Sequence, residues 1–338
     1  MAVKNILDSI ENLVVESRRM PLMNKSLIDE TDLIHLVDEL RRELPLELQK
    51  AERVMQERQD ILDRANDEAA ALIEKAKKYG TACVAVRNSS HYGIAGYWTS
   101  MATDEGMIGI TGTNARPSIA PTFGVENMLG TNPLTIGIPT DEGYPFLIDC
   151  ATSITQRGKL EFYERIGKDT PAGMVIGRDG SALTDTSYIL KALNNREAAL
   201  APLGGIGEEL GGYKGYSYAT AVELLSATLS GGMFLKNLTC IGENGELRPY
   251  HLGHFFIVID PEAMIGREVC EKTAGDILRA LRASQKAPGH DRIYTAGEKE
   301  WDIKEFRKDK GVPMGEDVQR EFIEVRDSLG MDFKFPFE

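Results

Sequence analysis

Short apolar runs separated by glycine-rich turns dominate the chain from residue 79 onward. Strands are expected where β-branched and other apolar residues cluster, at residues 83–86, 107–113, 134–139, 145–149 and 251–260. Helices are expected at residues 219–229 and around residues 277–281, where apolar positions recur at helical spacing. Short strands interspersed with helices predict a mixed α/β (α+β) fold.

The first 78 residues follow a different pattern, in which charged helical stretches replace the short strands. One helix is expected between Asp29 and Pro45, because leucine and valine recur there at helical spacing. A second is expected at residues 46–78, where apolar positions recur near the heptad spacing of coiled coils. The sequence therefore predicts a helical segment at 1–78 and a body at 79–338. The long helix is expected to form a coiled coil or a long hairpin, or to lie as a solvated amphipathic helix on the body.

The composition narrows the class of protein. The 338 residues carry a formal net charge of -13, so no nucleic-acid partner is expected. The four cysteines form no CxxC pair, and His251 and His254 have no third ligand nearby, so no metal is expected. Without a signal-peptide core or a membrane-length apolar run, a cytoplasmic protein with reduced thiols and no membrane association is expected.

His91 is the first candidate for chemistry. It follows the apolar run at 83–86 and a polar turn, and it precedes a segment rich in glycine, alanine and aromatic residues. A histidine at such a strand-to-helix junction can exchange a proton near neutral pH, and the glycines allow a ligand close to the backbone. The alternative is a histidine that caps the following helix.

Two further positions have both a functional and a structural interpretation. Asp149 ends a strand, and a helix is expected to start at Cys150-Ala151-Thr152-Ser153, so Asp149 either caps that helix or faces a ligand. Lys214 lies in a glycine-rich loop before the helix at 219–229, where it either meets a phosphate or is a solvated loop residue. No GxGxxG motif follows a strand, which argues against a Rossmann fold.

Seven motifs occur in unbroken order from about residue 75 to the C-terminus: Asn88-Ser89-Ser90-His91-Tyr92-Gly93, Gly130-Thr131-Asn132-Pro133, Asp149-Cys150-Ala151-Thr152-Ser153, Arg157-Gly158-Lys159, Gly212-Tyr213-Lys214-Gly215-Tyr216, Gly253-His254-Phe255-Phe256 and Gly297-Glu298-Lys299. Together they resemble the malate/L-lactate dehydrogenase family, which includes ureidoglycolate and sulfolactate dehydrogenases and cyclic imino-acid reductases.

The resemblance implies a homodimer that holds NAD or NADP in an α/β domain without a Rossmann fold. It implies hydride transfer between that cofactor and a small 2-hydroxy or 2-oxo acid, with His91 as the catalytic acid/base. It also implies a set of cofactor-contacting positions, namely Tyr92, Gly93, Ile94, Ala95, Thr113, Asn114, Asp149, Cys150, Ala151, Lys214, Gly297, Glu298 and Lys299. A serine that contacts the ligand in some relatives is replaced by Ala115.

The chain departs from the family pattern upstream of His91. Family members carry there an Asp-Ser-His-Gly stretch and an arginine that holds the substrate carboxylate, whereas this chain has the helical segment, which is similar to the stalk b subunit of ATP synthases. Two hypotheses follow. The chain is an oxidoreductase with impaired turnover, acting on a malate-like or lactate-like acid or on a cyclic imino acid, or it is a helical assembly module fused to a body that binds cofactor without turnover.

Overall fold

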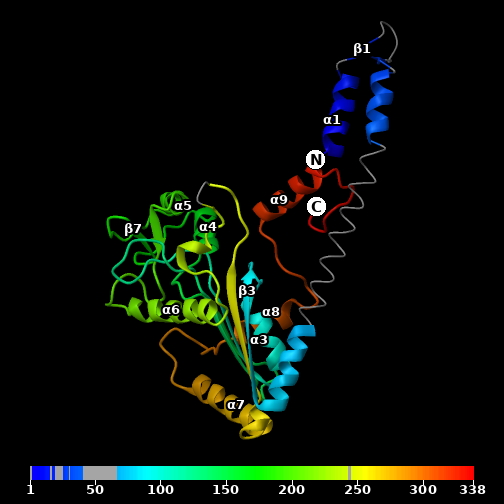
Figure 1. Cartoon of the computed structure of the whole chain (residues 1–338). Helices are drawn as coiled ribbons and strands as arrows, with labels where there is room; N and C mark the ends of the chain where they lie inside the picture. Colours follow the sequence, from blue (N-terminus) through cyan, green and yellow to red (C-terminus); the bar gives the residue numbers. More distant parts are fainter. Residues whose placement is uncertain (1, 16, 20–25, 30, 41–66, 243–244) are drawn as a thin grey trace. The chain divides into compact units, whose positions relative to one another are not determined.

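The computed structural model describes residues 2–15, 17–19, 26–29, 31–40, 67–242 and 245–338 (Figure 1). By packing, the chain divides into two compact units, Met1–Ala71 and Leu72–Glu338. The domain boundary predicted between residues 78 and 79 stays a prediction, because packing does not test whether either part folds alone. Within the described residues, none of the helices combines the length and the apolar composition needed to cross a membrane.

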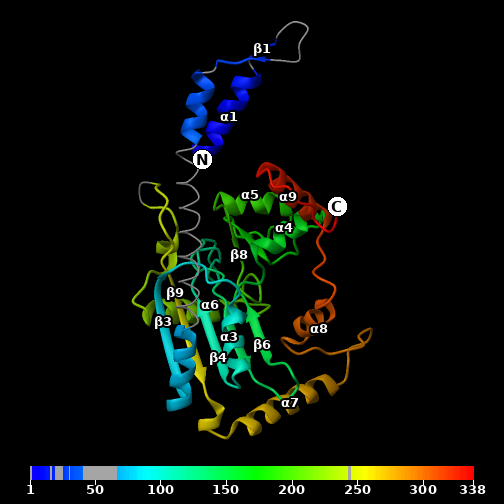
Figure 2. The ribbon, with the colours of Figure 1, turned by 90° about the vertical axis from the view of Figure 1, so that its right-hand side faces the viewer.

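Among its described residues, the first unit contains α1 (Ala2–Val15) and a helix at residues 31–40, which lie side by side (Figures 1 and 2), and the first residues of a helix at 67–79. Between them in sequence, β1 (Arg18–Arg19) and β2 (Ser26–Leu27) pair antiparallel.

Asp29 fixes the start of the helix at residues 31–40. Its Oδ1 accepts hydrogen bonds from the backbone N–H groups of Thr31 (2.8 Å) and Asp32 (3.2 Å), which have no partner within a helix. The helix expected from Asp29 is therefore present, with Asp29 at its N-terminal end. Its expected end at Pro45 and the first part of the helix expected at 46–78 lie outside the described residues, while residues 67–79 are helical.

The second unit is built around an antiparallel sheet with strand order β3-β9-β4-β5-β6. In chain order these strands are β3 (Thr81–Ser89), β4 (Ile108–Thr113), β5 (Leu134–Ile138), β6 (Phe146–Cys150) and β9 (Leu252–Ile259). They coincide with the five runs in which the sequence predicts strands. These strands pair antiparallel throughout, whereas a Rossmann fold has parallel βαβ units. The expectation of a mixed α/β fold that is not a Rossmann fold is therefore confirmed.

Helices cover both faces of this sheet. Figure 1 shows the sheet edge-on between α3 (Ala95–Asp104) and α6 (Gly212–Thr228). Gly109 of β4 and Gly137 of β5 lie opposite each other in register and face α3. A Cβ at Gly109 would lie 3.0 Å from the Cβ of Ala102, so these glycines allow α3 to pack closely on the strands.

The helix at residues 67–79 contributes to the same face. Leu72 and Ala76 are buried together with Ala102, Met107 and Val258, so this turn of helix completes an apolar cluster at the end of the sheet.

A second apolar core lies beyond the sheet. It involves α4 (Arg157–Arg165), α5 (Thr186–Asn194) and the antiparallel pair of β7 (Val175–Gly177) and β8 (Ala198–Leu200). The fully buried residues at its centre include Ile119, Leu160, Val175 and Ile189. The remaining described elements are η1 (Leu235–Leu238), η2 (Pro261–Ala263), α7 (Arg267–Ala283), α8 (Glu298–Arg307) and α9 (Glu316–Ser328).

Two predicted boundaries are wrong. Residues 151–156 are irregular and α4 begins at Arg157, so no helix starts at Cys150. The helix expected from Ala219 begins already at Gly212, and Gly211 at its N-cap adopts a left-handed conformation (φ 85°) that favours glycine. Lys214 therefore lies in the first turn of α6 rather than in a loop before it.

Candidate active site

The turn between β3 and α3 presents His91. The side chain is exposed, and its Nδ1 accepts a hydrogen bond from the backbone N–H of Gly93 at 3.1 Å. Gly93 adopts φ 85°, a left-handed conformation that favours glycine. The hydrogen bond occupies Nδ1, so proton exchange with a bound molecule falls to Nε2. The expected strand-to-helix position of His91 is confirmed, and its ring does not cap α3.

Tyr92 anchors this turn from the inside. Its ring stacks on those of His254 (centroids 4.5 Å apart) and Trp98 (6.3 Å), and the indole N–H of Trp98 donates to the Tyr92 carbonyl at 2.9 Å. Burial raises the pKa of Tyr92 to about 12, so its hydroxyl stays protonated at neutral pH. The aromatic stack therefore fixes the backbone next to His91.

His254 is the buried member of this stack. It is 2% exposed, and its Nδ1 lies 2.6 Å from the hydroxyl of Thr113 on the neighbouring strand. Burial lowers the pKa of His254 to about 4, so the ring is neutral at physiological pH. Sequence reasoning missed this role. It weighed His254 only as a metal ligand with His251, and no cluster of three or more potential ligands occurs among the described residues.

Asp149, at the end of β6, caps a helix, but not the one expected. Its Oδ2 accepts a hydrogen bond from the backbone N–H of Gly96 in the first turn of α3 (2.8 Å), and its Oδ1 accepts one from the Thr135 hydroxyl (3.3 Å). A Cβ at Gly96 would lie 2.8 Å from Oδ2, so this approach requires glycine there. The carboxylate thus ties β6 to the start of α3.

A pocket of about 770 Å³, which we call the α3 pocket, opens beside this junction. Figure 2 shows the elements that surround it, α3, β6 and the segment that enters α8. Its lining consists of Ile94, Gly96, Tyr97, Ser100, Leu147, Ile148, Asp149, Cys150, Tyr294, Thr295, Ala296, Gly297, Lys299 and Glu300. Five of the positions expected to contact the cofactor, from three distant segments of the chain, therefore line one cavity: Ile94, Asp149, Cys150, Gly297 and Lys299.

The segment before α8 is held by a buried carboxylate. Glu298 is 1% exposed, accepts hydrogen bonds from the backbone N–H (2.9 Å) and hydroxyl (3.0 Å) of Thr295, and pairs with Arg292. Its side chain therefore fixes the loop and does not line the α3 pocket. Lys299 does line it, with its ammonium 4.7 Å from the centroid of the Tyr294 ring.

Other expected positions lie outside this pocket. Asn114 is buried, donates to the Met233 carbonyl (3.1 Å) and accepts from the Gly253 N–H (2.8 Å), so it joins β4 to β9. Ala95 is buried in α3, Ala151 follows β6, and Lys214 is exposed on α6 with its ammonium 5.7 Å from the Tyr213 ring. Thr113, Tyr92 and Gly93 belong to the aromatic stack and the His91 turn described above.

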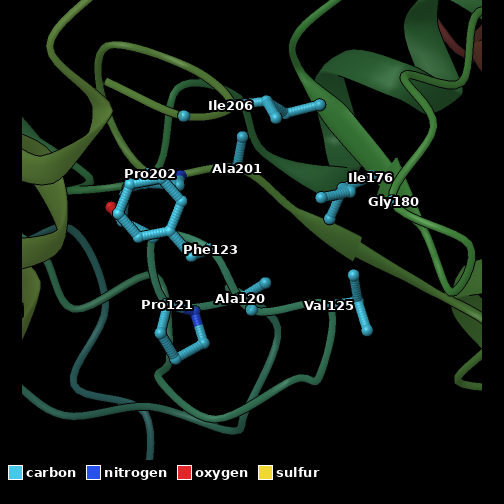
Figure 3. A pocket seen from close by; sticks show the side chains of 12 residues that line it. Ala120, Pro121, Phe123, Val125, Ile176, Gly180, Ala201, Pro202 and Ile206 are labelled. Atoms are coloured by element: carbon cyan, nitrogen blue, oxygen red, sulfur yellow. The ribbon is translucent and has the colours of Figure 1, made fainter.

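A smaller apolar pocket of about 220 Å³ has no counterpart in the sequence predictions. Figure 3 shows the loop at residues 120–125 on one side, and Ile176, Pro202 and Ile206 on the other. Phe123 in this loop is 81% exposed and adopts φ 66°. The size and apolar lining of this pocket suit a small apolar group rather than a dinucleotide.

Comparison with known proteins identifies the family. A family model described as malate/L-lactate dehydrogenase matches residues 64–322. The malate dehydrogenase of Pyrococcus horikoshii is 43% identical over 260 residues, which cover 77% of this chain and 69% of that protein. The L-sulfolactate dehydrogenase of Methanocaldococcus jannaschii is 36% identical, with 78% and 71% covered. The chain belongs to the malate/L-lactate dehydrogenase family, a family of enzymes, which confirms the resemblance seen in the seven motifs.

The solved structures agree with this assignment. Malate dehydrogenase from Entamoeba histolytica matches with a TM-score of 0.74 at 43% identity, over 79% of this chain and 73% of that chain. The family match begins at residue 64, upstream of the boundary predicted at residue 79. The expected similarity of residues 1–78 to the ATP synthase b subunit finds no support in these comparisons.

Proposed function

We propose that the chain transfers hydride between a nicotinamide dinucleotide, NAD or NADP, and a small 2-hydroxy or 2-oxo acid. The observation that carries this proposal is the α3 pocket, in which residues expected to contact the cofactor meet although they come from three separate parts of the sequence. The relatives named malate and sulfolactate dehydrogenases support the reaction class. Their names favour an acid with a second anionic group over a simple lactate-like acid.

The chemistry of the lining fits a dinucleotide. Asp149 offers carboxylate oxygens to ribose hydroxyls, as acidic residues do in other dinucleotide sites. Lys299 supplies a positive charge, and Leu147 and Ile148 supply apolar surface for a ring. When bound, the nicotinamide gives or takes the hydride. Because Asp149 repels and Lys299 attracts a 2′-phosphate, the balance between these two side chains decides the choice between NAD and NADP.

His91 is the proposed acid/base. In oxidation its Nε2 accepts the proton of the substrate hydroxyl, and in reduction it returns that proton to the carbonyl oxygen. Gly93 orients the ring through Nδ1, and the stack of Tyr92 on His254 holds the turn in place. A fixed turn places the reacting nitrogen reproducibly, and small misplacements of reacting groups are costly in rate.

Turnover by this chain is proposed to be weak. The residues upstream of His91 lack the Asp-Ser-His-Gly stretch and the substrate arginine that the family pattern carries there. A carboxylate that is held without a bidentate arginine is less firmly oriented, which costs on the order of 10² in rate.

Two measurements test the function. Titration of the purified chain with NADH and with NADPH, followed by cofactor fluorescence, is expected to show saturable binding. Steady-state rates on oxaloacetate, pyruvate and a cyclic imino acid are then expected to fall below the usual range of roughly 1–10³ per second. Absence of binding would contradict the proposed cofactor site, and rates within that range would contradict the proposed impairment.

The cyclic imino acid is included because a specific relative favours it. A reductase of pyrroline-2-carboxylate and piperideine-2-carboxylate from Pseudomonas putida is 30% identical over 261 residues. If the chain reduces the imino acid faster than oxaloacetate and pyruvate, imino-acid reduction would replace 2-oxo-acid reduction as the proposed function.

Self-association through the first unit stays a separate prediction. If the helical segment assembles the chain, light scattering should show a homo-oligomer that becomes smaller when the residues before Ile73 are deleted, while the rate is not restored. Retained cofactor binding without turnover in the full chain would favour the assembly-module hypothesis.

A further inference from the structure

A second large pocket, of about 890 Å³, lies away from the α3 pocket and gathers positive charge. The cations that line it are Arg116, Arg157, Arg178, Arg196 and Lys236, and they come from five separate segments of the chain. We call it the basic pocket. None of the positions expected to contact the cofactor lines it. In a chain with a net charge of -13, such a concentration of cations requires an explanation.

Hydrogen bonds of Arg178 hold two walls of the basic pocket together. Its guanidinium donates to the backbone carbonyls of Val125 and Arg196, and to Asn127 Oδ1 at 3.1 Å. All three acceptors are neutral. They therefore orient the guanidinium without neutralising its charge.

Only two of the five cations have a carboxylate partner. Arg157 pairs with Glu161 (2.7 Å) and also donates to Asn194 Oδ1 (2.6 Å), and Lys236 pairs with Glu126. Among the described residues, Arg116, Arg178 and Arg196 have no acidic partner within salt-bridge distance. The carboxylate of Glu126, which also lines the pocket, interacts with Arg178 only at longer range. The lining therefore keeps an excess of positive charge.

A purely structural role does not account for this set. The dipole of α5, which ends at Asn194, stabilises cations near its C-terminus. This effect accounts for the positions of Arg157, Arg178 and Arg196. Lys236 in η1 is accounted for by its ion pair with Glu126. Arg116, which follows β4, has neither explanation, and it lines the cavity at a cost in repulsion from the other cations that a bound anion would remove.

We propose that the basic pocket binds a small polyanion with adjacent phosphate groups. Arginine forks match the oxygens of phosphate in bidentate pairs, which favours phosphate groups over a diffuse negative surface. Three guanidiniums without a salt-bridge partner exceed the charge of one phosphate but match that of a diphosphate. The volume also lies in the range of pockets that enclose ligands larger than a single phosphate.

Inorganic pyrophosphate is the probe for this site. Calorimetric titration of the full chain at low salt is expected to give one binding event that weakens as salt rises. Arg116→Gln and Arg196→Gln change exposed side chains without acidic partners, so the fold should be retained. Each is expected to lower the affinity about tenfold, since a charge-assisted hydrogen bond is lost.

Lys191→Gln is the matched control, because Lys191 is an exposed cation on the same helix α5 but does not line the pocket. Its affinity for pyrophosphate should stay within about twofold of the unmodified chain. Saturation with NADH should leave the pyrophosphate affinity unchanged.

Three results would overturn the proposal. The first is no pyrophosphate binding at low salt, and the second is an equal loss of affinity in the Lys191 control. The third is competition between pyrophosphate and NADH, which would assign the anion to the cofactor site. Failure of NADH itself to bind would contradict the proposed dehydrogenase function and leave the pyrophosphate result interpretable on its own.

Discussion

The turn after β3 and the start of β9 each present a histidine at the same edge of the sheet, in opposite surroundings. His91 is exposed and held through Nδ1 by a backbone N–H, whereas His254 is buried beside Thr113. The difference arises from strand order. β9 lies between β3 and β4, so a residue on it is covered by neighbours, whereas His91 follows the end of an outer strand. Position in the sheet, rather than residue type, decides which histidine is exposed and which is buried.

The substitution expected to have the largest effect on the difference between the two histidines is His91→Ala. Loss of a positioned acid/base should lower the rate by about 10²–10⁴, while NADH affinity stays within a few fold. Steady-state rates and cofactor titration on the same preparation measure the two effects. His290→Ala, at an exposed histidine in the loop before α8, is the control and should change neither. An unchanged rate in His91→Ala would remove His91 from the mechanism.

His254 should affect stability through pH. Its pKa is about 4 in the folded chain, against an ordinary value of 6.5, so the unfolded chain binds the extra proton first as pH falls. Its contribution to stability is complete above pH 6.5 and is lost between pH 6.5 and about 4, at up to about 1.4 kcal/mol per pH unit.

Chemical unfolding across this pH range measures the effect. His254→Gln cannot titrate, so its free energy of unfolding should fall less steeply between pH 6.5 and 4 than that of the unmodified chain. Parallel pH profiles for the two proteins would show that His254 does not carry the dependence. His290→Ala again serves as the control, with an unchanged profile expected.

Asp149→Ala should have a smaller effect, which falls on both the stability of the chain and its affinity for the cofactor. Loss of the carboxylate that accepts from Gly96 N–H should cost about 1 kcal/mol of stability, as loss of a helix cap does. Cofactor affinity should fall about tenfold if the same carboxylate meets a ribose. Asp149→Asn keeps an acceptor for Gly96 and should recover most of the stability. A stability loss without any change in affinity would leave Asp149 as a cap alone.

Lys214→Ala should have the smallest effect. An exposed lysine in the first turn of α6 meets a phosphate mainly as a point charge, so cofactor affinity should fall only a few fold at low salt and less at high salt. Fluorescence titration at two ionic strengths measures it, with Lys191→Ala as the control. An unchanged dissociation constant at low salt would make Lys214 a solvated residue.

The strands could be predicted from the sequence because each is a short apolar run between turn residues. Their order could not, because β9 follows β6 by about a hundred residues yet lies between β3 and β4, and no local pattern records that pairing. The wrong helix start at Cys150 has a local cause. Asp149 resembles a helix cap in sequence and is one, but it caps α3, which is distant along the chain.

The candidate site was predictable to the extent that its residues sit in motifs. Four motif positions meet in the α3 pocket together with Ile94, which directly follows a motif, whereas Tyr97 and Tyr294 line it without any motif. The basic pocket could not be predicted from the sequence, because its cations lie in five separate segments and only Arg157 belongs to one of the motifs. Glu298 is the opposite example. The motif predicts that it contacts the cofactor, but its carboxylate is already bonded to Thr295 and paired with Arg292.

The aromatic packing around the α3 pocket also gives the molecule a built-in optical reporter. The chain has two tryptophans. Trp98 follows Tyr97 in α3 and donates to the Tyr92 carbonyl, while Trp301 follows Glu300 in α8 and stacks on Tyr144 with centroids 5.8 Å apart. Neither indole lines the cavity, but each belongs to a helix that does. Intrinsic emission can then follow each wall separately without any label, because replacing one indole by phenylalanine leaves the other to report alone.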